Sequence, residues 1–165
     1  MKAVQRSSYI RDGRAPIPKK EATSKIMSSI RAKNTKPELT LRKSLVASGL
    51  SGYRLHWKKV PGKPDISYPG IKLAVFVHGC FWHRCPYCNP PFPKSHKRFW
   101  KQKFKKNIER DIRKEHDLEN NGWKVVIIWE CQIKNDLRNC VSTIKKSKLK
   151  CWLQAYEIYD ASYWP

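Results

Sequence analysis

The sequence predicts an α/β fold in which a central mixed sheet is flanked by helices. Two short β-branched runs, residues 65–68 and 71–77, are joined by a Pro-Gly turn, and a third run occupies residues 123–129. A long amphipathic segment, residues 95–120, separates the second run from the third. Strands that alternate with helices are typical of α/β domains, so the expected order is helix, three strands, helix, strand, helix.

The chain of 165 residues fits one domain with a modest core and two extensions. Residues 1–22 mix Arg, Lys, Ser and Pro without periodicity, which predicts a flexible basic arm that follows phosphates or, more simply, a disordered tail. Residues 23–150 are the expected domain, which opens with a short helix around Met27. Residues 151–165 are expected to form an aromatic C-terminal tail.

A second helix is expected to begin at residues 35–38, where Thr-Lys-Pro-Glu spells a capping box with proline in the first turn. Leu41 and Leu45 lie on one face of this helix, and Gly49 is a plausible end. Glu38 has two interpretations. Its carboxylate can accept the Thr35 backbone N–H, which is sufficient reason for a glutamate, or it can take part in catalysis.

In the predicted strands between residues 53 and 78, polar residues lie on the exposed face or at strand ends. Apolar residues at positions 53, 55 and 57 alternate with Arg54 and His56, which predicts a half-buried strand with His56 on its wet face. Asp65 begins the next strand, and His78 ends the one after it. If the two runs pair as a hairpin, Asp65 and His78 lie near each other.

The long helix carries an explicit apolar face, and lysines and arginines populate the rest of its surface. The residues expected in the core recur every four positions: Trp100, Phe104, Ile108 and Ile112. The β-branched run 123–129 follows as a buried strand, and residues 137–144 begin a final amphipathic helix.

The charge balance favours a polyanionic partner. The chain has 35 Lys and Arg against 13 Asp and Glu, a formal net charge of +22, which is far more than solubility requires. Nucleic acid is the leading candidate, although a solvated basic surface, as in a ribosomal protein, has the same composition. Seven tryptophans favour nucleic acid, because exposed rings stack on or between bases. We expect no membrane span and a cytoplasmic location.

Four cysteines have metal-site spacing. Cys80, Cys85 and Cys88 follow a C-x4-C-x2-C pattern, and Cys131, after the last strand, can complete a four-sulfur set. In a reducing compartment thiols at such spacing bind metal rather than oxidise, so the pattern predicts structural zinc.

The same stretch offers groups for phosphodiester cleavage. Magnesium prefers one or two carboxylates, and Asp65 can supply one. His78 and His83 can supply a base or hydrogen-bond donors, although either histidine can also be a zinc ligand or support one.

Several strings together resemble one family. They are P-G-K-P-D at 61–65, F-V-H-G-C-F-W-H at 76–83, F-W at 99–100, K-N-I-E-R-D at 106–111 and W-E-C at 129–131. They resemble the very short patch repair (Vsr) mismatch endonucleases. The resemblance implies a restriction-endonuclease-like core, structural zinc, and magnesium-dependent nicking of duplex DNA beside a T:G mismatch left by deamination of 5-methylcytosine.

The resemblance also implies roles for single residues. It makes Asp65 the magnesium ligand, with the backbone carbonyl at Val77, where relatives often have Thr, as a second ligand. His83 becomes the general base for water, and His78 and Glu38 assist at the scissile phosphate.

The implied DNA contacts fall into two groups. An aromatic wedge of Phe81, Trp82 and Trp100 enters the duplex beside the mismatch, and Met27 approaches from the other groove. Lys103 and Asn107 correspond to positions that read the mispaired bases. Some relatives have histidine where Cys85 stands, a change that preserves tetrahedral zinc.

Two other hypotheses stay open from sequence. A restriction or homing-type endonuclease can share the core, because catalytic residues do not reveal which DNA is recognised. A non-catalytic zinc-stabilised nucleic-acid-binding module explains charge, zinc and aromatics but leaves Asp65 without a task. We further expect a monomer that works with mismatch-repair proteins.

Overall fold

The computed structural model describes residues 33–161, with side chains as far as residue 153. The predicted basic arm and the short helix around Met27 lie outside the described residues. The main elements are α2 (Lys36–Ala47), β1 (Arg54–Leu55), β2 (Ile66–Tyr68), η1 (Pro69–Ile71), β3 (Leu73–His78), α3 (Cys80–His83), α4 (Lys97–Asn120), β4 (Lys124–Trp129), α5 (Glu130–Asn135) and α6 (Leu137–Ala161).

The four strands form one mixed sheet in the order β1-β2-β3-β4. β2 and β3 are antiparallel, with Ile66 opposite Val75, and the short 3-10 turn η1 joins them as the Pro-Gly signal predicts. β4 runs parallel to β3, with His78 opposite Trp129, because the whole of α4 lies between them in the chain. The prediction of a mixed sheet flanked by helices is confirmed.

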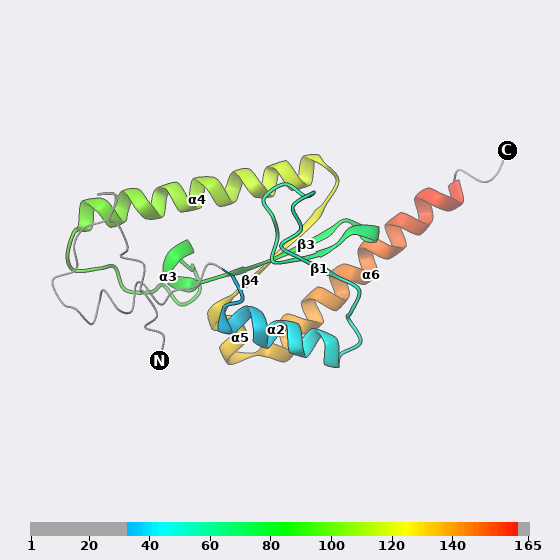
Figure 1. The fold of residues 1–165 in the computed structure, drawn as a ribbon, viewed down its shortest axis with the longest axis horizontal. Helices are drawn as coiled ribbons and strands as arrows, with labels where there is room; N and C mark the ends of the chain where they lie inside the picture. The colour runs from blue at the N-terminus through cyan, green and yellow to red at the C-terminus, as the bar shows by residue number, and fades with distance from the viewer. Residues whose placement is uncertain (1–32, 162–165) are drawn as a thin grey trace, which may run out of the picture.

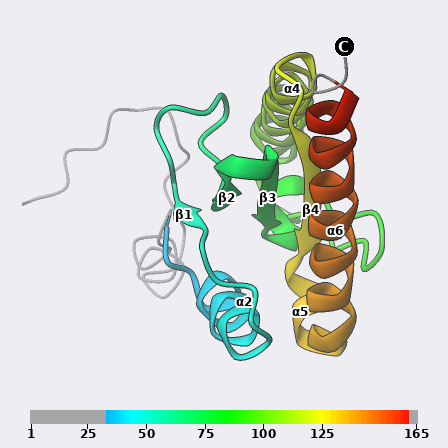
Figure 2. The same cartoon turned by 90° about the vertical axis from the view of Figure 1, so that its right-hand side faces the viewer.

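Helices cover both faces of the sheet. Figure 1 shows α4 along one side and α2, α5 and α6 on the other, and Figure 2 shows the strands between these layers. The larger core lies on the α2 and α6 side, where Leu41, Leu45 and Ile144 are fully buried against Leu73 and Val75. A smaller cluster on the α4 side is formed by Val60, Ala74, Phe76 and Leu118. Burial of these side chains supplies the main stabilisation of the layered fold.

The predicted first strand is wrong in extent and in facing. β1 contains two residues, both exposed, and Leu55 is 43% exposed although the alternation put it in the core. The cause is His56, whose φ of 44° lies in the left-handed region and ends the strand. Histidine is one of the few side chains enriched there. The turn directs His56 inward, so its predicted place on the wet face is wrong too.

Helix α4 has its predicted length but buries a different stripe. Its buried residues are Phe104, Asn107, Asp111 and Leu118, spaced as one helical face. The prediction is correct for Phe104 and wrong for Ile108 and Ile112, which are 40% and 49% exposed. Polar residues occupy the buried stripe because this part of α4 covers the polar end of the sheet.

The C-terminal region differs from the prediction at two elements: α5 was not expected, and α6 continues through residues 151–161, which were expected to belong to an aromatic tail. Helix α5 begins directly after β4, so Cys131 lies in its first turn and not at a strand end. Helix α6 starts as predicted and continues to Ala161, and Cys151 is buried in the larger core. Among the described residues, no helix is both long and apolar enough to cross a membrane.

Candidate active site and metal centre

Asp65 stands immediately before β2, beside the last residues of β3. Its Oδ2 accepts the backbone N–H of Val77 at 2.8 Å, a contact that the antiparallel pairing of the two strands makes possible. Burial raises the pKa of Asp65, and the Val77 N–H offsets only part of that effect. The carboxylate anion is therefore held in an environment that a nearby cation would stabilise.

Glu38, on the first turn of α2, is buried, and both of its carboxylate oxygens accept hydrogen bonds. Its carboxylate accepts the Asn34 N–H at 3.0 Å, the Thr35 hydroxyl at 2.8 Å and the guanidinium of Arg42 at 2.8 Å. The capping-box interpretation is wrong, because the acceptor faces the N–H of Asn34 and not that of Thr35. Proline in the first turn and the N-cap position of Thr35 are confirmed.

His56 lies between these two carboxylates. Its Nδ1 is 3.6 Å from Asp65 Oδ1, and its Nε2 is 3.8 Å from Glu38 Oε2. Glu38, His56 and Asp65 each offer a ligand atom, and the three atoms all lie within 4.8 Å of one another. Two carboxylates in one pocket suit a hard cation such as Mg²⁺, which binds oxygen. We call this set the carboxylate cluster.

A second group, the histidine cluster, lies on the other face of the sheet end and consists of His78, His83 and Asp111. His83 ends the short helix α3, and its Nδ1 contacts Asp111 Oδ2 of α4 at 2.5 Å. The imidazole of His78 stacks on that of His83, with ring centroids 4.1 Å apart and planes 10° from parallel. Asp111 contacts Nδ1 of His83 and not the other ring nitrogen, Nε2.

Electrostatics separate the two histidines. Burial, and then the neighbouring His83, lower the pKa of His78 to about 3, so His78 is neutral at physiological pH. Burial acts to raise the pKa of Asp111, but the hydrogen bond from His83 and the charges of His83, His78 and Arg110 together outweigh it, so the pKa is lowered. Asp111 is thus an anion that orients the His83 ring, as the carboxylate partner of a catalytic histidine does.

The two clusters meet at the end of β3 because successive strand residues point to opposite faces. Val77 packs toward the α2 and α6 core, whereas Phe76 and His78 face α4. Lys114 of α4 lies on the same side, with its Nζ 5.9 Å from the centre of the Phe76 ring. Burial lowers the pKa of Lys114, and the nearby Asp111 and Asp65 carboxylates oppose that effect.

Three of the predicted wedge residues form one aromatic group. The ring of Phe81 is 5.2 Å from that of Trp82 and 5.4 Å from that of Trp100, in both cases edge to face. All three side chains are half-buried, so each keeps part of its ring at the surface. Met27, predicted to approach from the other groove, lies outside the described residues.

The predicted base-reading residues differ in exposure. Lys103 is exposed on α4. Asn107 is only 7% exposed, and its amide donates to the Trp82 carbonyl oxygen at 2.9 Å. In this structure Asn107 therefore holds the backbone of α3 against α4.

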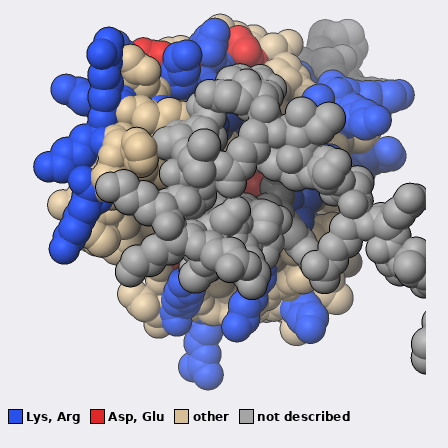
Figure 3. Space-filling view, turned by 60° about the vertical axis from the view of Figure 1, so that its left-hand side comes forward, with Lys and Arg blue, Asp and Glu red and all other residues tan. Residues whose placement is uncertain are grey.

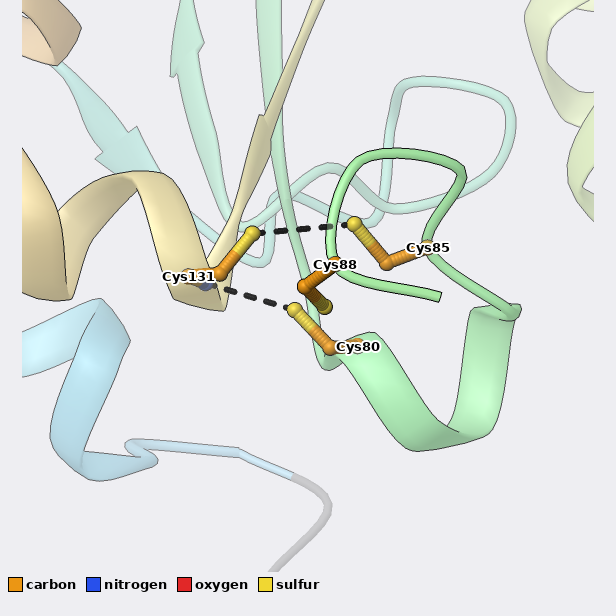
Figure 4. A group of neighbouring side chains, drawn as sticks. All are labelled: Cys80, Cys85, Cys88 and Cys131. Carbon is orange, nitrogen blue, oxygen red and sulfur yellow. Dashed lines mark hydrogen bonds between the residues drawn. The ribbon is translucent and has the colours of Figure 1, made fainter. Parts of the chain in front are cut away.

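The four cysteines predicted to bind zinc converge, and their sulfurs lie within 4.8 Å of one another. Figure 4 shows Cys80 at the start of α3, Cys85 and Cys88 on the loop that follows, and Cys131 approaching from α5. The Cys85 and Cys131 sulfurs are 3.6 Å apart, and the Cys131 N–H donates to the Cys80 sulfur. Four thiols at this spacing fit a tetrahedral metal such as zinc.

The pKa shifts of two of these thiols bear on metal binding as well. Burial raises the pKa of Cys80, so its thiolate is costly without a cation. Burial also acts to raise the pKa of Cys85, but the backbone N–H groups of Cys88 and Tyr87 and the thiols of Cys131 and Cys88 together outweigh it and lower the pKa. A cation that replaces the thiol protons relieves the cost at Cys80.

Basic side chains dominate the surface around this end of the molecule. In Figure 3, Lys and Arg project along both sides and the lower edge of the face shown, whereas Asp and Glu gather chiefly at its upper edge. The edges of this face are thus mostly cationic, which suits the phosphates of nucleic acid.

The chain is similar in sequence to known proteins. Residues 16–89 match the family model described as DNA mismatch endonuclease Vsr. The DNA mismatch endonuclease Vsr of Escherichia coli (strain K12) is 35% identical over 120 residues, which cover 73% of this chain and 76% of that relative. The chain belongs to the Vsr family.

Two type II nicking enzymes are similar too. The type II nicking enzyme V.NmeAIP of Neisseria meningitidis is 46% identical over 110 residues, 67% of this chain and 78% of the relative. The type II nicking enzyme V.XorIIP of Xanthomonas oryzae pv. oryzae is 42% identical over 110 residues, 67% of this chain and 80% of the relative. The resemblance found in the sequence is confirmed, and the protein is a DNA endonuclease.

Sequence reasoning missed three residues of this candidate site. Asp111 stands within the quoted K-N-I-E-R-D string, four positions after Asn107, and that helical spacing was a usable signal. Arg42 follows Glu38 by four positions, which predicts an ion pair. His56 had no such signal, because its inward direction depends on the left-handed backbone of one residue.

Proposed function

We propose that this enzyme nicks one strand of duplex DNA beside a T:G mismatch, in a magnesium-dependent reaction that starts very short patch repair of deaminated 5-methylcytosine. One observation carries the proposal: the carboxylate cluster and the His83–Asp111 pair lie on either side of the same strand end. The mismatch is supported by the E. coli relative's name, and single-strand cleavage by the nicking enzymes' names. The proposal includes the restriction-endonuclease-like core that the resemblance implies.

Asp65 is the proposed holder of magnesium, together with the backbone carbonyl of Val77. Bound magnesium supplies positive charge that neutralises the phosphate in the transition state. Glu38 assists from the opposite side of the cluster, where Arg42 and the Asn34 N–H fix its carboxylate. The donor set fits the ion, because the two side chains offer oxygen.

His83 is the proposed general base for the attacking water. Asp111 holds Nδ1, so the proton taken from water goes to Nε2, and the carboxylate stabilises the imidazolium that results. His78 is neutral and stacked on His83, which lets it donate a hydrogen bond to the phosphate without adding a second positive charge to the pair.

The proposed DNA contacts use the aromatic group and α4. Phe81, Trp82 and Trp100 unstack the step beside the mismatch, with Met27 from the other groove, at a cost that is lower for a mispair. Lys103 and Asn107 contact the mispaired bases. For Asn107 this requires release of the Trp82 carbonyl, so base reading and movement of α3 are coupled.

The remaining features follow from the same proposal. We propose that zinc bound by Cys80, Cys85, Cys88 and Cys131 is structural and that it fixes the segment that carries Phe81 and Trp82. We propose that the enzyme acts as a monomer in the bacterial cytoplasm, at the nucleoid. Mismatch-repair proteins would then process the nicked DNA.

The test is single-turnover cleavage of three labelled duplexes with and without magnesium. They carry T:G, matched C:G in the same context, or randomised sequence. We expect one nick, in the T:G duplex alone, that disappears with EDTA. Equal cleavage of a matched duplex at one sequence would establish the sequence-specific alternative instead, and binding without cleavage in every duplex would leave a non-catalytic binding module.

A further inference from the structure

Arg42 is the buried cation of the carboxylate cluster. It is 7% exposed, and its Nη1 donates to Asn34 Oδ1 at 2.6 Å while its Nη2 donates to Glu38 Oε2 at 2.8 Å. The same Nη2 lies 3.1 Å from Nε2 of His56. Two fixed hydrogen bonds therefore hold the guanidinium directly against the imidazole ring.

A guanidinium carries only donors, and it does not lose its proton in proteins. A contact of 3.1 Å between Arg42 Nη2 and His56 Nε2 is favourable only when Nε2 is the acceptor and has no hydrogen. In the neutral ring the hydrogen is then on Nδ1, which faces Asp65 Oδ1 at 3.6 Å. That separation exceeds a hydrogen bond, so the N–H acts on Asp65 electrostatically.

The backbone keeps the ring in this place. His56 has a left-handed φ of 44°, and its N–H donates to the Asp65 carbonyl oxygen at 3.4 Å. The imidazole is 15% exposed, so it is enclosed by its partners. The ring thus presents one nitrogen to Arg42 and the other to Asp65.

We propose that Arg42 fixes the Nδ1–H tautomer of His56 and so keeps this histidine out of the metal's ligand set. A nitrogen that carries hydrogen has no lone pair for a metal, so the cluster offers oxygens alone. Oxygen ligands suit Mg²⁺, whereas an imidazole nitrogen favours transition metals such as Ni²⁺. Arg42 and His56 are therefore positioning residues that set metal choice; the inference rests on the proposed role of Asp65 as metal ligand.

The direct test is the ¹⁵N chemical-shift pattern of the His56 ring in the metal-free catalytic site, at mildly alkaline pH and with zinc saturated beforehand. His56→Gln assigns the signal. We expect the Nδ1–H tautomer in the natural protein, and the Nε2–H tautomer would overturn the inference. This ¹⁵N measurement needs no variant of Arg42, and it does not depend on the protein's cleavage activity.

The second test measures Ni²⁺ and Mg²⁺ affinity by calorimetry in zinc-saturated protein. In Arg42→Met the ring is free to present Nδ1, so the ratio of Ni²⁺ to Mg²⁺ affinity should rise about 10-fold or more, the scale at which partners of metal ligands act. The double variant Arg42→Met/His56→Gln should return that ratio to its natural value. An unchanged ratio in folded Arg42→Met, or a raised ratio that persists in the double variant, would overturn the inference.

Matched controls are Arg138→Met and His116→Gln, both exposed and remote in sequence from the cluster. His56→Gln alone should keep the natural ratio, because a glutamine amide can accept from Arg42 and donate toward Asp65. Asp65→Asn separates this inference from the proposed function. If Asp65→Asn leaves Mg²⁺ affinity unchanged, the proposed role of Asp65 fails, whereas the ¹⁵N pattern still decides the tautomer.

Discussion

The carboxylate cluster and the histidine cluster occupy the same strand end but are built in different ways. The carboxylates of Glu38 and Asp65 are fixed by backbone N–H groups and, at Glu38, by the guanidinium of Arg42. His78 and His83 are stacked imidazoles, one kept neutral by burial and the other oriented by Asp111. Under the proposed function, the two clusters therefore have separate tasks: the carboxylate cluster holds the metal ion, and the histidine cluster transfers the proton.

The largest effect is expected at the carboxylate cluster. Asp65→Ala should abolish cleavage while leaving affinity for duplex DNA, because affinity comes mainly from the basic surface. Single-turnover cleavage and a gel-shift assay on the same preparation measure both. Residual cleavage within a few fold of the natural rate would show that Asp65 does not hold the metal, and the division between the clusters would be lost.

The histidine cluster should show a smaller loss. His83→Ala is expected to lower the single-turnover rate by about 10²-fold or more, the usual scale for a general base. Its Mg²⁺ dependence should stay unchanged, since the histidine cluster does not hold the ion. The exposed His116, replaced by Ala, is the matched control. A rise in the Mg²⁺ requirement of His83→Ala would contradict the separation of tasks.

Asp111→Asn tests orientation within the histidine cluster. The substitution replaces an acceptor oxygen by an amide that can face Nδ1 of His83 with a hydrogen, which disfavours the productive tautomer. We expect a rate about 10-fold or more below the natural one. Adding Asp111→Asn to His83→Ala should cost little more, because the carboxylate acts through the ring; full additivity would mean that Asp111 acts on its own.

Glu38→Gln should have the smallest effect. The amide keeps the shape of the side chain but removes one negative charge from the carboxylate cluster, so the Mg²⁺ concentration for half-maximal rate should rise a few fold. The rate at saturating Mg²⁺ should change less. A lowered saturating rate with an unchanged Mg²⁺ requirement would place Glu38 in the proton-transfer step instead.

Local sequence patterns correctly predicted the elements whose structure depends on residues close together in the chain. The β2–β3 hairpin follows from its Pro-Gly turn, and the cysteine set from spacing. Prediction from the sequence failed where a contact with a distant part of the chain decides which residues are buried. Ile108 and Ile112 continue an apolar repeat, yet the sheet end beside α4 needs the polar stripe of Asn107 and Asp111.

Other parts of the site were beyond any local pattern. No sequence signal marks the left-handed backbone that directs His56 inward. The start of α5 directly after β4 was also missed, because residues 130–135 are too short for a helical repeat to be recognised. Site residues could therefore be named individually, while their grouping into two clusters depends on strand pairing.

The cysteine site has a consequence for folding. Cys80 and Cys131 lie 51 positions apart, in the first turns of the helices that follow two parallel strands, and the pairing of these strands requires the α4 crossover to close. A metal bound to both acts as a cross-link, and by the chain-entropy relation used for disulfides it removes roughly 4 kcal/mol of loop freedom from the unfolded chain. His83 lies within the same metal-bound loop, between Cys80 and Cys85. A chelator that removes this ion should therefore inactivate the enzyme, even with Mg²⁺ restored in excess, because the crossover and the loop that carries His83 lose their cross-link.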